Sequence, residues 1–346
     1  MSRNVLAPAT QRLSHNRNYR VNAVHDDFGG SKWNSKNQNT SKGYEEPDLY
    51  ADDDYGEDSA ECNIEQLPDG SFKLALHVPK SFYGGLIGLK GSTKRRIETE
   101  TKTDIHVPRQ NDISNDLLIK SNERSNVCAA LRKIRLLIDS LRKRMRPTHF
   151  LAVPLNSGQV LKRFVELKQS ILDAQLPGID PELFISERCI HITLGVYVLL
   201  DDAERKNAVN ELQTCRQWLS GLSTPFELKI KGLEIMNDDP SSVRVLYAAV
   251  ESPELQQFAD KCLKHFQTTG LCATDNNQRD SIKLHMTVLN NHYRKDNKSN
   301  FDGREILKRY GDYDFGTAQC KEVHMCVIKS SQEVEDFYKI TGSLTF

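Results

Sequence analysis

The chain has 346 residues, with 47 Lys and Arg against 47 Asp and Glu, so its formal net charge at pH 7 is zero. At roughly 150 residues per domain, this length predicts two domains and an additional tail. The balanced charge excludes a strongly basic protein that binds nucleic acid over its whole surface. Any such binding must therefore come from local clusters of charge.

Cysteine usage and hydropathy predict a protein of a reducing, intracellular compartment. None of the eight cysteines forms a C-x-x-C pair, which disfavours a zinc ribbon or a thioredoxin-type motif. No apolar run approaches the length of about 20 residues that a membrane span needs. The N-terminus also lacks a signal-peptide pattern, so we expect neither a membrane partner nor secretion.

Residues 1–63 are poor in large apolar side chains and rich in Asn, Ser, Asp, Glu and Arg. Such a composition cannot bury enough surface to offset the entropy of ordering, which predicts a mostly disordered tail. His15 to Val24, "HNRNYRVNAV", mixes arginines with Tyr19 and Val21. It is a candidate segment for docking a partner, with a plain tail as the alternative.

Residues 64–146 are predicted to form a first compact domain. An alternating strand at 70–78 precedes a short helix, a glycine break and a second helix within 81–102. Two further strands follow, "TDIHVP" and "DLLIKS". Residues 123–145 then have helical spacing of apolar residues, at Val127, Leu131, Ile134, Ile138 and Leu141.

The glycine break reads Gly88, Leu89, Lys90, Gly91, with Lys94 and Arg95 in the helix that follows. Two glycines let a nucleic-acid backbone approach closely. The next helix offers free N–H groups to phosphate, and its cations add charge. Ile87, Leu89, Ile97, Ile105 and Val107 are expected to line an apolar groove under the bases.

The order strand, helix, G-x-x-G, helix, two strands and long helix resembles the type I KH domain. This resemblance implies binding of single-stranded RNA or single-stranded DNA through Gly88 to Gly91, Lys94 and Arg95. The alternative is a degenerate KH fold that serves only as a scaffold. The basic run Arg142 to Arg146 is open to three interpretations: a nuclear signal, a phosphate patch or a solvated helix end.

Residues 147–346 are predicted to be an α+β domain of alternating strands and helices. Strands are expected at the following segments: 148–155, 188–199, 226–236, 243–250, 281–290, 321–329 and 338–346. Helices are expected at 157–172, at 201–220 after Asp201 and Asp202, at 253–269 and at 302–310. The two halves share this organisation, which indicates a weak internal duplication.

Each half contains one His-x-Thr strand: "CIHITLG" with His191 and Thr193, and "IKLHMTV" with His285 and Thr287. Residues two apart on a strand share a face, so each histidine lies beside its threonine while the intervening residues enter the core. Lys283 is expected on the face of His285, where it adds positive charge.

Two imidazoles with ordinary pKa values near 6.5 suit acid–base chemistry near neutral pH. One histidine would take a proton from a nucleophile and the other would give one to the leaving alkoxide. The threonine hydroxyls, assisted by Lys283, would bind the phosphate oxygens. This scheme needs no metal and no cofactor. The structural alternative is two hydrogen-bonded strand histidines, and His324, followed by Cys326 in place of Thr, is assigned to structure.

The paired "HIT" and "HMT" motifs resemble the 2H phosphoesterase superfamily. That resemblance implies a bilobal α+β fold with pseudo-twofold symmetry and metal-independent action on RNA ends, cyclic phosphates or 2′,5′-linkages. It carries the catalytic roles over to His191, Thr193, His285 and Thr287. It does not tell which histidine is the acid.

With a KH domain upstream, the whole chain resembles a family that joins these two modules. Further matches are "NYRVN", "KLHMTVLN", "MNDDP" and "FDGREIL". The family implies a nuclear protein in a helicase-containing complex for transcription coactivation and the response to DNA alkylation damage. The rival hypothesis is a non-catalytic RNA-binding adaptor of that complex.

Overall fold

The computed structural model describes residues 10–13, 17–20, 63–109, 116–273, 279–295, 299–332, 335 and 337–346. The chain divides into two units, Met1–Asp54 and Tyr55–Phe346. In the first unit, β1 (Thr10–Leu13) and β2 (Arg17–Arg20) form an antiparallel hairpin with Thr10 opposite Arg20. Apart from these strands, the predicted tail and the predicted docking segment lie outside the described residues.

The KH domain consists of a four-stranded antiparallel sheet and three helices. The sheet order is β3-β4-β6-β5, with β3 (Glu65–Gln66), β4 (Phe72–His77), β6 (Asp116–Ser121) and β5 (Asp104–His106). The helices are α1 (Tyr83–Ile87), α2 (Ser92–Thr101) and α3 (Arg124–Arg142). Apart from the two-residue strand β3, which was not predicted, this is the predicted order of elements, and the type I KH fold is confirmed.

The apolar spacing of α3 explains why this helix packs on the sheet. Val127, Leu131 and Ile134 are at most 2% exposed and belong to one core with Leu74 and Ile119 of the sheet. Residues at positions i, i+4 and i+7 share one helical face, so a single apolar stripe is enough to bind the helix to the strands. The predicted stripe is confirmed.

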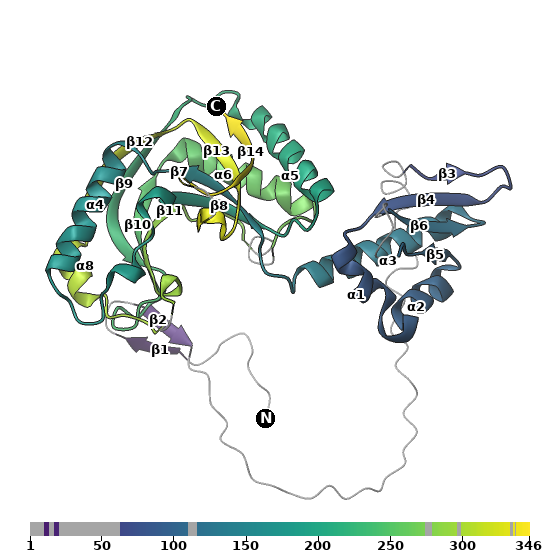
Figure 1. Ribbon diagram of the computed structural model, residues 1–346, viewed down its shortest axis with the longest axis horizontal. Helices are drawn as coiled ribbons and strands as arrows, with labels where there is room; N and C mark the ends of the chain where they lie inside the picture. The colour runs from purple at the N-terminus through teal and green to yellow at the C-terminus, as the bar shows by residue number, and fades with distance from the viewer. Residues whose placement is uncertain are drawn as a thin grey trace, which may run out of the picture. The chain divides into compact units, whose positions relative to one another are not determined.

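The second domain is built on one eight-stranded sheet that curls (Figure 1). Its strands are β7 (His149–Pro154), β8 (His191–Tyr197), β9 (Phe226–Ile235), β10 (Val245–Glu251), β11 (His285–Asn290), β12 (Asp314–Cys320), β13 (Glu322–Val327) and β14 (Ile340–Thr345). The main helices are α4 (Gly158–Asp173), α5 (Asp202–Thr214), α6 (Pro253–Thr268) and α8 (Arg304–Tyr310).

The sheet order is β12-β9-β10-β11-β8-β7-β13-β14, and its centre divides it into two lobes of four strands each. One lobe contains β8, β7, β13 and β14, and the other contains β11, β10, β9 and β12. In each lobe a long helix connects the two innermost strands, α4 between β7 and β8 and α6 between β10 and β11. The bilobal α+β fold is therefore confirmed, and its two central strands are the two His-x-Thr strands.

In the second domain, three details differ from the sequence-based expectation. Strand β12, "DFGTAQC", was not predicted, because Asp, Gly, Ala and Gln have little intrinsic preference for strands. It forms because β9 offers it a partner along its whole length, from Lys231 opposite Asp314 to Phe226 opposite Cys320. The helix predicted to reach residue 220 ends at Thr214, where a 3-10 turn takes over, and the strand predicted from residue 281 begins only at His285.

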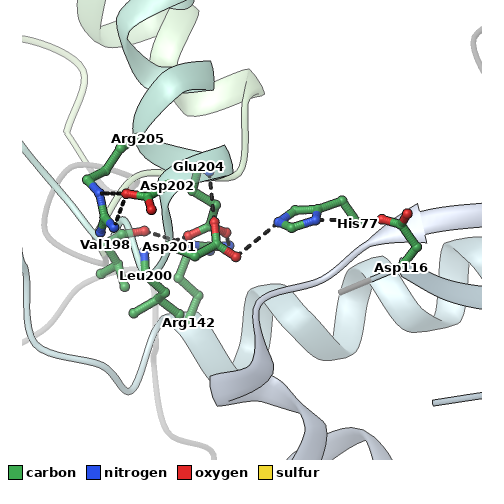
Figure 2. Close-up of polar contacts among 9 residues, drawn as sticks. All are labelled: His77, Asp116, Arg142, Val198, Leu200, Asp201, Asp202, Glu204 and Arg205. Atoms are coloured by element: carbon green, nitrogen blue, oxygen red, sulfur yellow. Dashed lines mark hydrogen bonds and ion pairs between the residues drawn. The ribbon is translucent and has the colours of Figure 1, made fainter. Parts of the chain in front are cut away.

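A buried ion pair joins the KH domain to the second domain (Figure 2). Arg142, the last residue of α3, donates to both carboxylate oxygens of Glu204 on α5 and to the carbonyl of Val198. The Arg142 residue is 5% exposed and Glu204 is 7% exposed. The first arginine of the basic run at 142–146 is therefore occupied here and unavailable to a phosphate or an import receptor.

A second contact crosses the same junction (Figure 2). The His77 ring lies 3.0 Å from the Asp201 carboxylate and 3.7 Å from that of Asp116. Asp201 also caps α5, because its side chain accepts from the backbone N–H of Glu204 at 2.9 Å. The predicted role of Asp201 at the start of this helix is confirmed.

Candidate functional site

The pairing of β8 with β11 brings the two His-x-Thr motifs together. Met286 lies opposite Ile192 in an antiparallel register. In this register Thr193 is opposite His285 and Thr287 is opposite His191. Residues directly opposite each other have Cβ atoms about 4.5–5.5 Å apart. The four predicted residues therefore form one compact group that spans both lobes.

The two strands alternate as the sequence predicts. His191, Thr193, His285 and Thr287 are partly exposed. On the opposite face, three side chains are fully buried, namely Ile190, Ile192 and Met286, and Leu284 is only 6% exposed. The core side of each strand therefore fixes the position of the imidazole and hydroxyl on its other side.

Both imidazoles are held by the same kind of hydrogen bond. Nδ1 of His191 lies 2.6 Å from the carbonyl oxygen of Cys189, and Nδ1 of His285 lies 2.7 Å from that of Lys283. A carbonyl oxygen can only accept, so Nδ1 carries the proton in each ring. Each Nε2 is then left to exchange a proton with a ligand. Each backbone partner lies two residues before its histidine, and no sequence pattern indicates it.

His191 lies in an aromatic environment. Its ring centroid is 5.0 Å from that of Phe150, 5.4 Å from that of Tyr338 and 6.2 Å from that of Phe337. Burial lowers the pKa of His191 to about 4, because the charged ring would lose its hydration. A smaller lowering comes from the charge of His285, which places the two rings within electrostatic range of each other.

His285 lies in a more polar environment. Its ring is 5.3 Å from that of Tyr247, whose hydroxyl donates to Glu234 at 2.5 Å. Burial lowers the pKa of His285, the bond to the Lys283 carbonyl raises it, and the Lys283 charge lowers it. The two histidines thus share a tautomer and a geometry but have different surroundings.

Lys283 lies at the edge of this group, just before β11 begins. Its ammonium donates to the Tyr247 hydroxyl and to Glu234, at 3.2 Å from the latter, and lies 4.7 Å from the centre of the Tyr247 ring. These partners raise the pKa of Lys283, with the Tyr247 hydrogen bond as the largest cause. The predicted positive charge is beside His285, but a carboxylate and a phenol already bind it.

His324, the histidine assigned to structure, is on β13. Its Nδ1 lies 2.7 Å from the Ser343 hydroxyl, and the residue is only 8% exposed. Burial is the main cause that lowers its pKa. These contacts agree with the structural role that Cys326 in place of a threonine indicated.

The G-x-x-G loop connects α1 to α2 in a conformation that needs its glycines. Gly88 has φ of 69° and Gly91 has φ of 79°, in the region that side chains disfavour. A Cβ on Gly88 would lie 2.2 Å from the Thr93 hydroxyl and 2.9 Å from the Thr93 nitrogen. The backbone of α2 therefore approaches the loop so closely that only glycine fits at position 88.

The predicted side chains around this loop separate into two groups. Leu89 is 84% exposed, and Lys90 and Arg95 are also exposed, so they are available to a ligand. Lys94 instead forms an ion pair with Glu98 at 2.8 Å. Arg95 lies against Gly91, where a Cβ would be 3.6 Å from its guanidinium.

The expected apolar groove beneath the bases is mostly closed. Ile97 and Ile105 are 4% and 3% exposed and belong to the KH core. The hollow between them and Val107 holds only about 10 Å³, which is about the space of one water molecule. Ile87, at 38%, and Leu89 are the exposed apolar residues of the predicted set. The prediction failed because Ile97 and Ile105 pack into the core that α3 shares with the sheet.

In the described residues, no group of three or more His, Cys, Asp or Glu side chains is arranged to hold a metal ion. No helix of the described part of the chain has the length and apolar character to cross a membrane.

Two family models match the chain. Residues 147–346 match the AKAP7 2′5′ RNA ligase-like domain, and residues 73–136 match the KH domain. Activating signal cointegrator 1 complex subunit 1 of Mus musculus is 32% identical over 311 residues, which cover 81% of this chain and 86% of the mouse protein.

Two solved structures are also similar to parts of the chain. The first KH type I domain of human vigilin is 24% identical, with a TM-score of 0.22, and covers 27% of this chain and 97% of that one. A phosphoesterase crystal structure is 14% identical, with a TM-score of 0.36, and covers 58% of this chain and 99% of that one.

Proposed function

Because the chain belongs to the family of activating signal cointegrator 1 complex subunit 1, with an AKAP7 2′5′ RNA ligase-like domain, we propose that it is an RNA phosphodiesterase. Its two domains make it an RNA-binding, phosphoesterase-like protein. Our proposal adds turnover: cleavage of RNA or hydrolysis of a cyclic phosphate, without a metal ion or cofactor, on single-stranded nucleic acid gripped by the KH domain.

The observation that carries the proposal is the matched pair of histidines on adjacent central strands. Both rings keep Nε2 for a ligand, and each lies opposite a threonine of the other lobe. Proton transfer by one positioned group typically contributes about 10²–10⁴ to a rate. Two such groups on one phosphate can act as acid and base in the same step.

The proposed reaction on a 2′,3′-cyclic phosphate uses both rings. One neutral imidazole takes a proton from water as its oxygen bonds to phosphorus. The other, protonated imidazole gives its proton to the ribose oxygen as the P–O bond breaks. In cleavage of an RNA chain, the 2′-hydroxyl replaces water and the 5′-oxygen of the next nucleotide leaves. Thr193 and Thr287 donate to the non-bridging oxygens and stabilise their growing charge.

Two further sets of residues belong to the proposal. Lys283 adds positive charge at the edge of the site, held in place by Glu234 and Tyr247. In the KH domain, Gly88, Leu89, Lys90 and Gly91 contact the nucleic-acid backbone, with Arg95 exposed beside them and Lys94 released from Glu98 when phosphate binds.

The experiment is turnover of defined short RNAs by the full chain, with the masses of the new termini as the readout. We expect cleavage or ring opening that persists in EDTA and disappears in the double variant His191→Ala, His285→Ala. Loss of activity in EDTA, or unchanged product with both histidines removed, would refute the proposed mechanism. Binding without any turnover would instead support the non-catalytic adaptor.

Family membership also underlies a proposed setting. We place the protein in the nucleus, bound to the helicase subunit and other subunits of the activating signal cointegrator 1 complex, in transcription coactivation and the response to DNA alkylation. Co-purification of the full chain with that helicase from nuclear extract tests this setting. Recovery of the chain free of the complex would contradict it.

A further inference from the structure

A groove of about 410 Å³ lies on the lobe that contains β9, β10, β11 and β12. It is at the end of β10 and β11 that is far from His285. Pockets for small ligands usually have volumes of about 300–1,000 Å³, so it is large enough for a nucleoside. Met236, Arg244, Val245, Asn290, His292 and Tyr293 are among its lining residues.

The strand geometry shows that this groove continues the histidine face of the sheet. Val288 and Leu289 are adjacent on β11 and both fully buried, so a bulge sends both into the core. Thr287 and Asn290 on either side of them are both partly exposed. Asn290 therefore follows Thr287 on the same face of the sheet.

The aromatic side of the groove is formed by Tyr293. Tyr293 is 38% exposed, and its hydroxyl is close enough to Tyr338 to contribute to raising the pKa of that phenol. The ring centroid of Tyr338 in turn lies 5.4 Å from that of His191. On the other side Met236 is 47% exposed. A flat apolar ring would therefore find an aromatic wall and a flexible thioether here.

The polar side of the groove presents hydrogen-bond donors. The Asn290 Oδ1 accepts from the backbone N–H of His292 at 2.9 Å, which directs its NH₂ group away from that bond. Within the described residues that NH₂ group has no protein partner, and neither does the exposed Arg244 guanidinium. The nearby Asn237 side chain is different, because it bonds the backbone at Asp239, Ser242 and Arg244.

We propose that this groove binds the nucleoside next to the reacting phosphate and selects a keto base, guanine or uracil, through Asn290 and Arg244. This inference rests on the proposed function. Guanine O6 and N7, and uracil O4, accept from such donors. Adenine and cytosine have an amino group in the position of that keto oxygen. The amino group would face the donors of Asn290 and Arg244 and leave those donors without an acceptor. Sites built on hydrogen bonds reject such mismatches strongly, and we expect a preference of about 10- to 100-fold.

The test is the affinity of the full chain for the four nucleoside 2′-monophosphates, measured by calorimetry. The wild type should bind the guanine and uracil compounds about tenfold or more tightly than the adenine and cytosine compounds. Asn290→Asp keeps the size of the side chain and the bond to His292, but replaces the donor by an acceptor. It should lower the ratio towards one, since a carboxylate cannot donate to guanine O6 or uracil O4 but accepts from the amino groups of cytosine and adenine.

The added negative charge weakens binding of all four phosphates, so the ratio between bases is the quantity to compare. Asn207→Asp, on the exposed side of α5, is the matched control and should leave the ratio unchanged. Arg244→Gln should lower the guanine preference. The substitutions at residues 290 and 244 both lie outside the KH domain. Differences in nucleotide affinity between these variants and the wild type therefore report on the groove.

Equal wild-type affinities for the four bases, or an unchanged ratio in Asn290→Asp, would overturn the inference. This result does not depend on catalysis. If the base preference is present but no RNA is turned over, the phosphodiesterase proposal fails and the subsite remains.

Discussion

The two lobes hold their histidines by the same backbone hydrogen bond but surround them differently. His191 has three aromatic rings within 6.2 Å, whereas His285 has one tyrosine that belongs to a network with Glu234 and Lys283. A duplicated scaffold has therefore fixed the position of each ring, while the side chains of neighbouring strands determine its protonation. Equal geometry with unequal environments suits two different roles in proton transfer.

The largest expected effect is the removal of either imidazole. His191→Ala and His285→Ala should each lower kcat by about 10²–10⁴, because each removes one proton transfer from the reaction. His324→Ala is the control, and it should reduce thermal stability while leaving kcat nearly unchanged. A single-histidine variant with wild-type kcat would mean that only the other lobe performs catalysis.

The next effect concerns the threonines. Thr193→Val and Thr287→Val keep the branched shape but remove the hydroxyl, and we expect losses of about 10²–10³ in kcat for each, as for other donors to a developing oxyanion. Thr193→Ser and Thr287→Ser retain the donor and should stay within a few-fold of the wild type. Steady-state kinetics on one defined RNA measures all four, and a large loss in the serine variants would indicate packing rather than a hydroxyl.

A smaller effect should separate the two lobes. Tyr247→Phe removes the hydroxyl shared by Lys283 and Glu234, and we expect kcat to fall about tenfold, the value of roughly one hydrogen bond. The pKa of His285, followed by NMR, should change while that of His191 does not. Tyr338→Phe, the counterpart beside His191, should spare kcat. Equal responses of both rings to either substitution would contradict independent environments.

The smallest expected effect is a pH optimum that lies below neutral pH. The base must be neutral, so kcat/KM rises as pH increases through its pKa. The acid must be protonated, so kcat/KM falls through the acid's pKa. Burial lowers the pKa of His191 to about 4 and holds that of His285 below 6.5. The profile should therefore be a bell with its maximum between about 4 and 6.5, whichever histidine is the acid.

The pH profile requires a stability control. His149 and His191 both have pKa values lowered to about 4 by burial. The unfolded chain binds protons at these rings near pH 6.5 and the folded chain does not, so their contribution to stability falls as pH decreases from 6.5 towards 4. Circular dichroism across the same range separates unfolding from loss of catalysis. An optimum above pH 7 in folded protein would contradict the assigned environments.

Much of the fold could be predicted because the signals are local. The apolar alternation around His191 and His285 fixed both central strands, and the glycines at 88 and 91 marked the KH loop. Strand β12 could not be predicted, since its pairing with β9 compensates for a sequence with weak strand preference. The closed KH groove was missed for a related reason: helix packing, invisible in the sequence, buries Ile97 and Ile105.

The candidate site was predictable in its centre and unpredictable in its surroundings. The repeated His-x-Thr pattern identified four side chains. Glu234 and Tyr247 come from strands that carry no motif, and only the register of β9 and β10, which places Glu234 opposite Tyr247, brings them beside His285. Asn290 follows a bulge, and a regular alternation would have assigned it to the wrong face.

The Arg142–Glu204 pair also determines how the chain can be dissected. A cut before residue 147 would remove Arg142 together with the surface that the KH domain covers, and the Glu204 carboxylate would keep only the hydrogen bond from the Leu200 backbone N–H among the contacts described here. A fragment of residues 147–346 that misfolds or loses activity would therefore reveal nothing about RNA delivery by the KH domain. Replacing Arg142 by Met in the full chain breaks the pair while the KH domain is retained, and so separates the two explanations.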